Sequence, residues 1–301
     1  MEESISMIIL NYNSSSNTIR LAQDTLKICP LINIVIVDNN SKDEDIKKLE
    51  LFGLTDIKIH LIKNNKNMGY AKGNNIGIKY AIDKLCSEYI IIANPDIEYN
   101  SKTIIINLVN ELSSLNKDFA CLTGIMLDCN KKVNLDRICW KLPGKISDFF
   151  ANFRLLNKFF NPLRYHNLKM IADKNVITVD TIPGCFFIIR ASAFQDINYF
   201  DEGTFLYCEE RILAKKLANK NYKTGVLLSE SFIHNHPKSN DFAKNLKLQN
   251  LLLKSRRYYN QNYNDSYKTN IFVKLILEFS FYGGQIENYL VYFCKKIKHY
   301  L

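Results

Sequence analysis

Apolar and polar positions follow two different periods along the first half of the chain. Short runs rich in β-branched residues recur, and most are followed by a longer segment whose apolar residues are spaced three and four apart, as in Ile104, Leu108, Val109 and Leu112. The runs expected to form strands are Ile5–Leu10, Asn33–Val37, Ile57–Ile62, Tyr89–Ala93 and Phe119–Ile125. This alternation predicts an α/β fold with a mostly parallel, Rossmann-like sheet flanked by helices.

The pattern changes twice further along the chain. Residues 128–175 mix basic and aromatic residues without clear periodicity, so we expect an insertion there. Strand-like runs return at Val176–Ile182 and Cys185–Ile189, and helical spacing dominates from about Asp241. We therefore expect one α/β domain over residues 1–240, followed by a helical appendage over residues 241–301.

Charge and cysteine content narrow the classes of partner and compartment. The formal net charge of +10 favours anionic partners such as nucleotides or acidic lipids, and without a nucleic-acid-binding motif we expect no nucleic acid. Eight scattered cysteines without a CxxC pair are typical of free thiols in a reducing compartment. The N-terminus has no basic region of a signal peptide, and Lys274, Glu278 and Glu287 interrupt the most apolar stretch. We expect a cytoplasmic protein that is soluble or peripheral at the inner face of the cell membrane.

A carboxylate follows the second predicted strand directly, in the sequence VDNNS. Asp38 would lie at the carboxyl end of that strand, where open α/β sheets bind ligands, and could accept hydrogen bonds from a base or ribose. The alternative is an Asx turn or a helix cap.

Three glycines with the spacing GxxxGxxxG mark the start of a predicted helix in NMGYAKGNNIGI. Gly69, Gly73 and Gly77 would allow a ligand to approach the backbone closely, and a helix N-terminus favours phosphate. The spacing is not that of the dinucleotide-binding motif. The alternative is that the glycines serve helix packing.

Acidic residues follow the strand Tyr89–Ala93 in the sequence ANPDIE. Asp96, together with Glu98, offers hard oxygen ligands suited to Mg²⁺ or Mn²⁺ shared with substrate phosphates. The alternative is a Pro-containing turn whose Asp caps the next helix.

Two later segments carry further candidate chemistry. Glu209 and Glu210 precede an amphipathic helix and could supply a general base, although acidic residues are favoured in any first helical turn. In HNHPKS, His234 or His236 could bind a metal, and Lys238 and Ser239 could contact phosphate. The alternative for this segment is a structural or surface role.

Taken in order, these segments resemble the bacterial family-two glycosyltransferases of GT-A fold, especially the rhamnosyltransferase-like members. The matching stretches are MIILNYN, VDNNS, NMGYAKGNNIGI, ANPD, IPGCFFIIRASAF, FDEGTFLYCEE and IHNHPKS. The resemblance implies an inverting transfer of a sugar from a UDP- or dTDP-sugar to an acceptor hydroxyl, with no covalent enzyme intermediate.

The resemblance also implies roles for single residues on the donor side. Asn11 and Tyr12 would lie beside the nucleotide, and Asp38 would read the pyrimidine. The residues expected to shape the rest of the donor pocket are Asn67, Gly69 and Asn74.

The metal and the base are assigned in the same way. Asn94 replaces the first acid of the family's DxD motif, so Asp96 would be the metal-side carboxylate, and His234 would be a metal or diphosphate ligand. Glu210 takes the position of the family's base with one extra methylene, and Glu209 is the alternative.

The C-terminal region suits an interfacial surface that binds anionic lipids, consistent with a glycan acceptor carried on a polyprenyl diphosphate. A helical cap or a dimer interface is the alternative, and the oligomeric state stays open.

Two other function classes are alternatives to a sugar transferase. A sugar-phosphate nucleotidyltransferase should have a Gly-rich basic loop near the first strand, where the chain has LNYNSSSN. A non-catalytic sugar-nucleotide or glycan-binding module should lack the acids at NPD and Glu209–Glu210, which are present.

Overall fold

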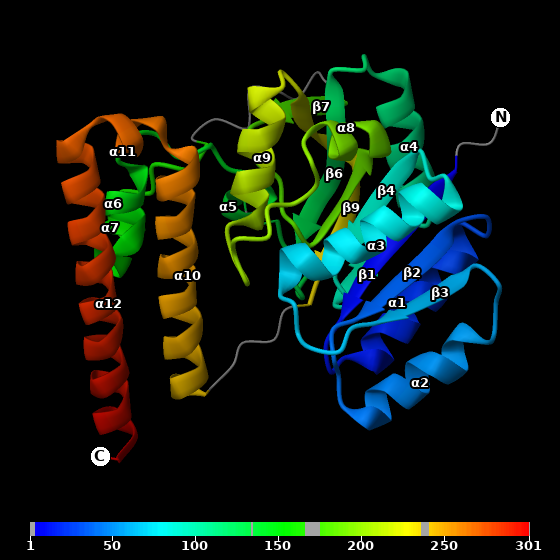
Figure 1. The fold of residues 1–301 in the computed structure, drawn as a ribbon, viewed down its shortest axis with the longest axis horizontal. Coiled ribbons are helices and arrows are strands. Elements are labelled where there is room, and N and C mark those ends of the chain that lie inside the picture. The colour runs from blue at the N-terminus through cyan, green and yellow to red at the C-terminus, as the bar shows by residue number, and fades with distance from the viewer. Residues whose placement is uncertain (1–3, 134, 166–174, 236–240, 301) are drawn as a thin grey trace.

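A computed structural model describes residues 4–133, 135–165, 175–235 and 241–300. Within these residues, nine strands form one sheet with helices on both faces (Figure 1). The strands are β1 (Ile5–Asn11), β2 (Asn33–Asp38), β3 (Ile59–Lys63), β4 (Tyr89–Ala93), β5 (Ile97–Tyr99), β6 (Phe119–Leu127), β7 (Val176–Val179), β8 (Phe186–Arg190) and β9 (Lys223–His234). The helices are α1 (Ser15–Ile28), α2 (Asp43–Gly53), α3 (Tyr70–Leu85), α4 (Ile104–Ser114), α5 (Leu135–Ile138), α6 (Ser147–Asn152), α7 (Arg154–Phe159), α8 (Ala191–Asp196), α9 (Glu209–Asn219), α10 (Phe242–Tyr263), α11 (Asp265–Thr269) and α12 (Ile271–Tyr300).

The strand order is β3-β2-β1-β4-β8-β6-β9-β5, with β7 paired to β9. Strands β3, β2, β1 and β4 are parallel, whereas β8 runs antiparallel to both of its neighbours. In the registers of β1, Asn11 pairs with Asp38 and Ile9 pairs with Ala93. The carboxyl ends of β1, β2 and β4 therefore meet at one edge of the sheet. The predicted α/β class is confirmed, and the sheet is mixed beyond β4.

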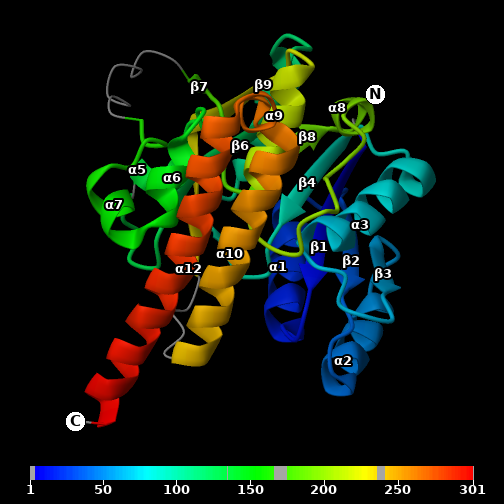
Figure 2. The same cartoon turned by 60° about the vertical axis from the view of Figure 1, so that its left-hand side comes forward.

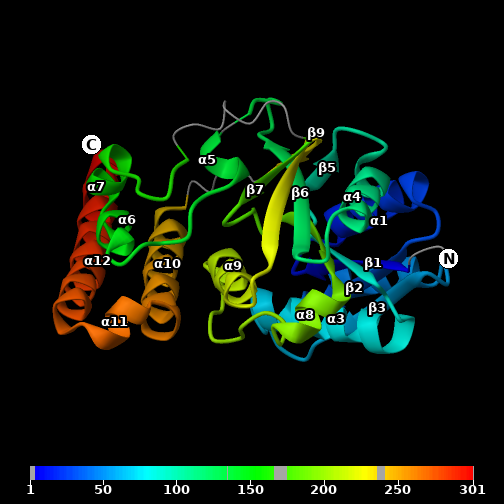
Figure 3. The ribbon, with the colours of Figure 1, turned by 90° about the horizontal axis from the view of Figure 1, so that it is seen from above.

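Both faces of the sheet are covered, which explains the uninterrupted apolar runs of its central strands. Ile34 and Ile36 of β2 belong to the core beneath α1, α2 and α4, whereas Val35 and Val37 belong to the core beneath α3, α8 and α9. Figure 3 shows α1 and α4 on one face of the sheet and α3, α8 and α9 on the other. Adjacent residues of one strand thus enter opposite cores.

Two of the three glycines in the GxxxGxxxG motif lie in α3 and serve packing against the sheet. A Cβ atom on Gly73 would lie 2.5 Å from Leu10 Cδ1, and one on Gly77 would lie 2.6 Å from Ile8 Cγ2. Helix α3 can approach β1 this closely because neither position has a side chain. Gly69 differs, because it precedes the helix with a φ of 80°.

The C-terminal helices α10 and α12 lie side by side as an antiparallel pair joined by α11 (Figures 1 and 2). Helices α6 and α7, from the predicted insertion, pack against this pair. Asn152 Nδ2 donates to Ser280 Oγ at 2.9 Å, and the Arg154 backbone N–H donates to Glu287 at 2.7 Å. Residues from two distant parts of the sequence therefore form one helical layer beside the sheet. No helix within the described residues is long and apolar enough to cross a membrane.

Candidate active site

A cleft of about 1180 Å³ opens where β1 and β4 end. Three of the predicted donor-side residues, Tyr12, Asn94 and Asp96, line it together. Two basic residues that no motif singled out also line it, Arg20 from α1 and Lys244 from the first turn of α10. The cleft thus combines carboxylate, amide, aromatic and basic groups, a composition that suits a polar anionic ligand.

The turn that carries Asp96 is fixed from two sides. Arg20 donates hydrogen bonds to the carbonyl oxygens of Pro95 at 3.2 Å and Ile97 at 2.9 Å. Ile97 pairs with His234 across β5 and β9, and the Asn235 N–H donates to the Asp96 carbonyl oxygen at 3.0 Å. As a result the side chains of Asp96 and His234 face each other, with Asp96 Oδ1 at 3.2 Å from His234 Nε2.

This pair fits two ligands of one small divalent ion. Mg²⁺ and Mn²⁺ accept carboxylate oxygen and imidazole nitrogen at about 2.0–2.2 Å, so two ligands of one ion lie about 3 Å apart. No group of three or more His, Cys, Asp or Glu that could hold a metal occurs in the described part of the chain. The remaining ligands would have to be substrate oxygens and water, which is the usual arrangement for Mg²⁺ on a nucleotide.

Asn11 and Asp38 lie behind the cleft in a buried hydrogen-bond network. Asn11 Nδ2 donates to Asp38 Oδ1 at 2.8 Å, and Asn11 Oδ1 accepts from Thr18 Oγ1 at 2.8 Å. Asp38 Oδ2 accepts the Ser41 N–H at 3.0 Å. Both side chains are fully buried and hold the ends of β1 and β2 together. The reading of a pyrimidine by Asp38 stays a prediction.

Asn67 and Gly69 lie in the loop before α3, which Asn39 organises. Asn39 Nδ2 donates to Asn67 Oδ1 at 2.9 Å, and Asn67 Oδ1 also accepts the Gly69 N–H at 3.0 Å. A Cβ atom on Gly69 would lie 2.5 Å from the carbonyl oxygen of Phe205, so no side chain fits there. Asn74 is buried in α3, and its Oδ1 has no hydrogen-bond partner among the described residues.

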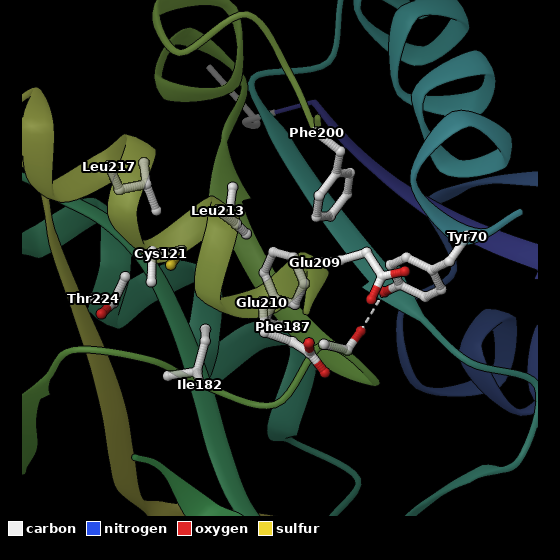
Figure 4. A pocket seen from close by; sticks show the side chains of 12 residues that line it. Tyr70, Cys121, Ile182, Phe187, Phe200, Glu209, Glu210, Leu213, Leu217 and Thr224 are labelled. Carbon is white, nitrogen blue, oxygen red and sulfur yellow. Dashed lines mark hydrogen bonds between the residues drawn. The ribbon is translucent and has the colours of Figure 1, made fainter. Parts of the chain in front are cut away.

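The two candidate base residues, Glu209 and Glu210, lie in a small cavity that shares Tyr70 with the cleft. Tyr70 lines the cleft and also a cavity of about 10 Å³ lined by Glu209 and Glu210, which leaves room for at most one water molecule (Figure 4). Tyr70 Oη donates to the Gly184 carbonyl oxygen at 2.5 Å, and a Cβ atom on Gly184 would lie 2.9 Å from Glu210 Cγ. The structure thus places both carboxylates next to the donor-side cleft.

Burial shifts the acid–base behaviour of this pair. Glu209 is 5% exposed and its Oε1 has no partner among the described residues; burial, and then the charge of Glu210, raise its pKa to about 8. Burial also raises the pKa of Glu210, opposed by backbone hydrogen bonds and by Arg211. Raised carboxyl pKa values are typical of groups that exchange protons near neutral pH.

The backbone that leads into the pair is strained. Tyr207 and Cys208 have φ values of 75° and 70°, a left-handed region that residues with a Cβ rarely adopt. They turn the chain so that Glu209 and Glu210 begin α9. Strain of this kind concentrates at functional sites, and here it lies directly before the candidate base.

The raised pKa of Glu209 predicts that stability depends on pH. Between pH 4.5 and about 8 the native state binds more protons than the unfolded state, so the free energy of unfolding should fall as pH rises through this window. Glu209→Gln should reduce this fall, and the raised pKa of Glu210 should account for what remains. Urea unfolding at pH 5 and pH 8 measures it, with the exposed Glu88→Gln as control. An equal fall with pH in the wild type and in Glu209→Gln would contradict the assignment.

Of the predicted histidine segment, the structure describes His234 and Asn235, whereas His236, Lys238 and Ser239 lie outside the described residues. Arg20 and Lys244 could not be found from motifs. Arg20 lies in a segment whose sequence predicts only a helix. Lys244 lies in the C-terminal region, which contains no motif that indicates donor binding. Their positions become evident only when α1 and α10 are folded against the cleft.

The chain is similar in sequence to known proteins. The sequence model of glycosyl transferase family 2 matches residues 6–197. A low-salt glycan biosynthesis hexosyltransferase of Haloferax volcanii is 30% identical over 238 residues, covering 79% of this chain and 69% of that protein. A rhamnosyltransferase of Escherichia coli is 30% identical over 154 residues, covering 50% of this chain and 54% of that protein.

Solved structures show the same fold. A mannosyltransferase from Pyrobaculum calidifontis, determined in complex with GDP-Man and Mn²⁺, aligns with a TM-score of 0.59 at 12% sequence identity. The alignment covers 96% of this chain and 74% of the mannosyltransferase. At this identity the likeness concerns the fold alone.

Proposed function

Because the chain belongs to glycosyl transferase family 2, and is thus a glycosyltransferase, we propose that it moves a sugar from a nucleoside diphosphate sugar to a hydroxyl group of a glycan acceptor with inversion. The observation that carries this proposal is that Tyr70 lines both the cleft that contains Asp96, the partner of His234, and the cavity that contains Glu209 and Glu210. Membership of the family favours transfer over the nucleotidyltransferase and the non-catalytic binding module.

In the proposed reaction, the donor diphosphate lies in the cleft beside Arg20 and Lys244. Asp96 and His234 would hold Mg²⁺ or Mn²⁺, which when bound neutralises charge on the departing nucleoside diphosphate. Glu210 accepts the proton of the acceptor hydroxyl. At the same time the hydroxyl oxygen bonds to the anomeric carbon, and the bond from that carbon to the phosphate oxygen breaks. Glu210 is assigned this role because it takes the position of the base in the family, and Glu209 is the alternative.

The donor is proposed to be a UDP- or dTDP-sugar, bound with help from Asn11, Tyr12, Asp38, Asn67, Gly69, Asn74 and Asn94. The mannosyltransferase with a similar fold was determined with GDP-Man, so GDP-sugars belong in the same test.

A donor panel tests the proposal. The chain is incubated with UDP-, dTDP- and GDP-sugars, with and without Mn²⁺, and release of the nucleoside diphosphate is followed. We expect release from at least one donor and at least a tenfold loss when the metal is removed, because Asp96 and His234 need the ion to offset the diphosphate charge. The absence of release from every donor, in the presence of metal, would overturn the proposed function.

We also propose that the acceptor is linked to a lipid such as a polyprenyl diphosphate, and that the chain binds an anionic membrane surface peripherally at the cytoplasmic face. Helix α12 supports this, because its 30 residues span about 45 Å and carry exposed apolar side chains at helical spacing. These side chains are Ile271, Phe272, Leu275, Ile276, Phe279, Tyr282, Ile286, Tyr289, Leu290, Phe293 and Ile297. Residues 241–301 also contain ten Lys and Arg against four Asp and Glu, which attracts acidic headgroups.

Liposome sedimentation distinguishes this surface from a dimer interface. We expect Phe279→Ser with Ile286→Ser to weaken binding to vesicles that contain anionic lipid, because both side chains are exposed on α12. The matched control replaces Leu54 and Ile57, two exposed apolar residues of the α/β domain, by Ser. If the α12 variant binds vesicles as the wild type does but dissociates a dimer in size-exclusion chromatography, the membrane proposal is wrong.

A further inference from the structure

A groove of about 600 Å³ runs between α10 and α12, beside the loop that leads to the candidate base. Its apolar lining includes Phe205, Leu246, Leu251, Tyr292 and Phe293. Lys247 and Lys254 line it as well, and no acidic residue does so within the described part of the chain. We infer that this groove binds the lipid diphosphate portion of the acceptor, an inference that rests on the proposed function and names the acceptor site.

The groove is continuous with the candidate active site at one end. Phe205 lies four residues before Glu209, and its carbonyl oxygen accepts the Tyr70 N–H at 2.9 Å. Ser255 Oγ of α10 donates to the Leu206 carbonyl oxygen at 2.7 Å, which fixes this loop against the helix. One turn of α10 separates Lys247, which lines the groove, from Lys244, which lines the donor cleft. A ligand in the groove therefore ends close to both the base and the donor.

At its other side the groove reaches the exposed apolar surface of α12. Tyr289 and Phe293 line the groove, and both are also about half exposed on that helix, at 49% and 56%. The groove and the exposed apolar surface of α12 therefore share these two side chains. This continuity favours a ligand with a long apolar tail.

The lining contains separate groups for the charged and the apolar part of such a ligand. The two lysines offer ammonium groups to a diphosphate, and the surrounding aromatic and leucine side chains bury apolar surface. The groove thus matches a diphosphate joined to a prenyl chain, with the acceptor sugar directed toward Glu210.

Direct titration with three probes tests the inference: farnesyl diphosphate, farnesol and inorganic pyrophosphate, each with and without excess UDP. We expect farnesyl diphosphate to bind at least about tenfold more tightly than either fragment, and UDP not to displace it, because head and tail contribute together at a site separate from the donor cleft. Lys247→Gln with Lys254→Gln should weaken it by about tenfold or more, since both ammonium groups that can pair with the diphosphate are removed. Leu251→Gln should weaken farnesyl diphosphate without changing pyrophosphate.

The matched control is Lys47→Gln with Lys48→Gln, which removes the same charge from exposed positions on α2. Equal affinity of the wild type and the Lys247/Lys254 variant for farnesyl diphosphate would overturn the inference, as would its full displacement by UDP. The donor panel tests the proposed function independently of this binding experiment. A chain that binds farnesyl diphosphate as expected but releases no nucleoside diphosphate from any donor keeps the groove and loses the transferase proposal.

Discussion

Glu210→Gln is expected to lower kcat for sugar transfer by about 10²–10⁴-fold, the usual effect of removing a general base. Gln preserves the size of the side chain against Gly184 but cannot accept the acceptor's proton. Donor affinity should be unchanged, because Glu210 lines the small cavity and not the cleft that contains Asp96. Initial rates of nucleoside diphosphate release with acceptor present, together with equilibrium binding of the donor, measure the two effects separately.

Glu209→Gln is the matched control for this substitution. Glu209 is the more deeply buried of the two carboxylates, so its loss should reduce kcat less than the loss of Glu210. It should also lower the pKa that limits the rate, because the charge of one carboxylate disfavours ionisation of the other. If Glu210→Gln keeps full activity while Glu209→Gln is inactive, the base is Glu209.

Asp148→Ala should destabilise the protein by about 3–5 kcal/mol, because it leaves buried positive charge without a counter-ion. Arg211 donates to both carboxylate oxygens of Asp148, at 2.9 and 3.0 Å, and Asn260 donates to Asp148 Oδ2 at 2.9 Å. The exposed fractions of Asp148 and Arg211 are 1% and 6%. The three residues join α6, α9 and α10, so urea unfolding should report the loss in full.

The same substitution should reduce activity in the fraction that remains folded, because Arg211 directly follows Glu210 in α9. The control is Asp196→Ala, which breaks the exposed pair with Lys220 and should cost at most about 1 kcal/mol. A destabilisation by Asp148→Ala no larger than that of Asp196→Ala would show that the buried pair contributes little.

The strand pattern of the N-terminal half could be predicted because both faces of the sheet are covered by helices. Runs such as IVIV at residues 34–37 stay apolar throughout, and the strands β1, β2, β4 and β6 lie where these runs occur. Strand β9 could not be found in this way. Its pairing with β6 shifts between Gly124 and Ile125, and its buried Glu230 accepts hydrogen bonds from Thr103 and Asn107. A buried carboxylate inside a strand breaks the apolar pattern.

The candidate site was predictable where a residue follows a strand in a recognisable motif. Asp96 and His234 were both singled out from the sequence, and the structure brings them to 3.2 Å. Contacts between distant segments could not be read from the sequence. The support of Asp96 by Arg20 and the pairing of Arg211 with Asp148 depend on how the helices pack, and neither has a local signal.

The configuration of the transferred sugar tests the central proposal most directly. Once the panel identifies a donor, proton NMR of the glycan product gives the configuration at the anomeric carbon. Direct displacement by a hydroxyl group that Glu210 deprotonates predicts the configuration opposite to that of the donor. A product with the donor's configuration would contradict a single displacement at this site.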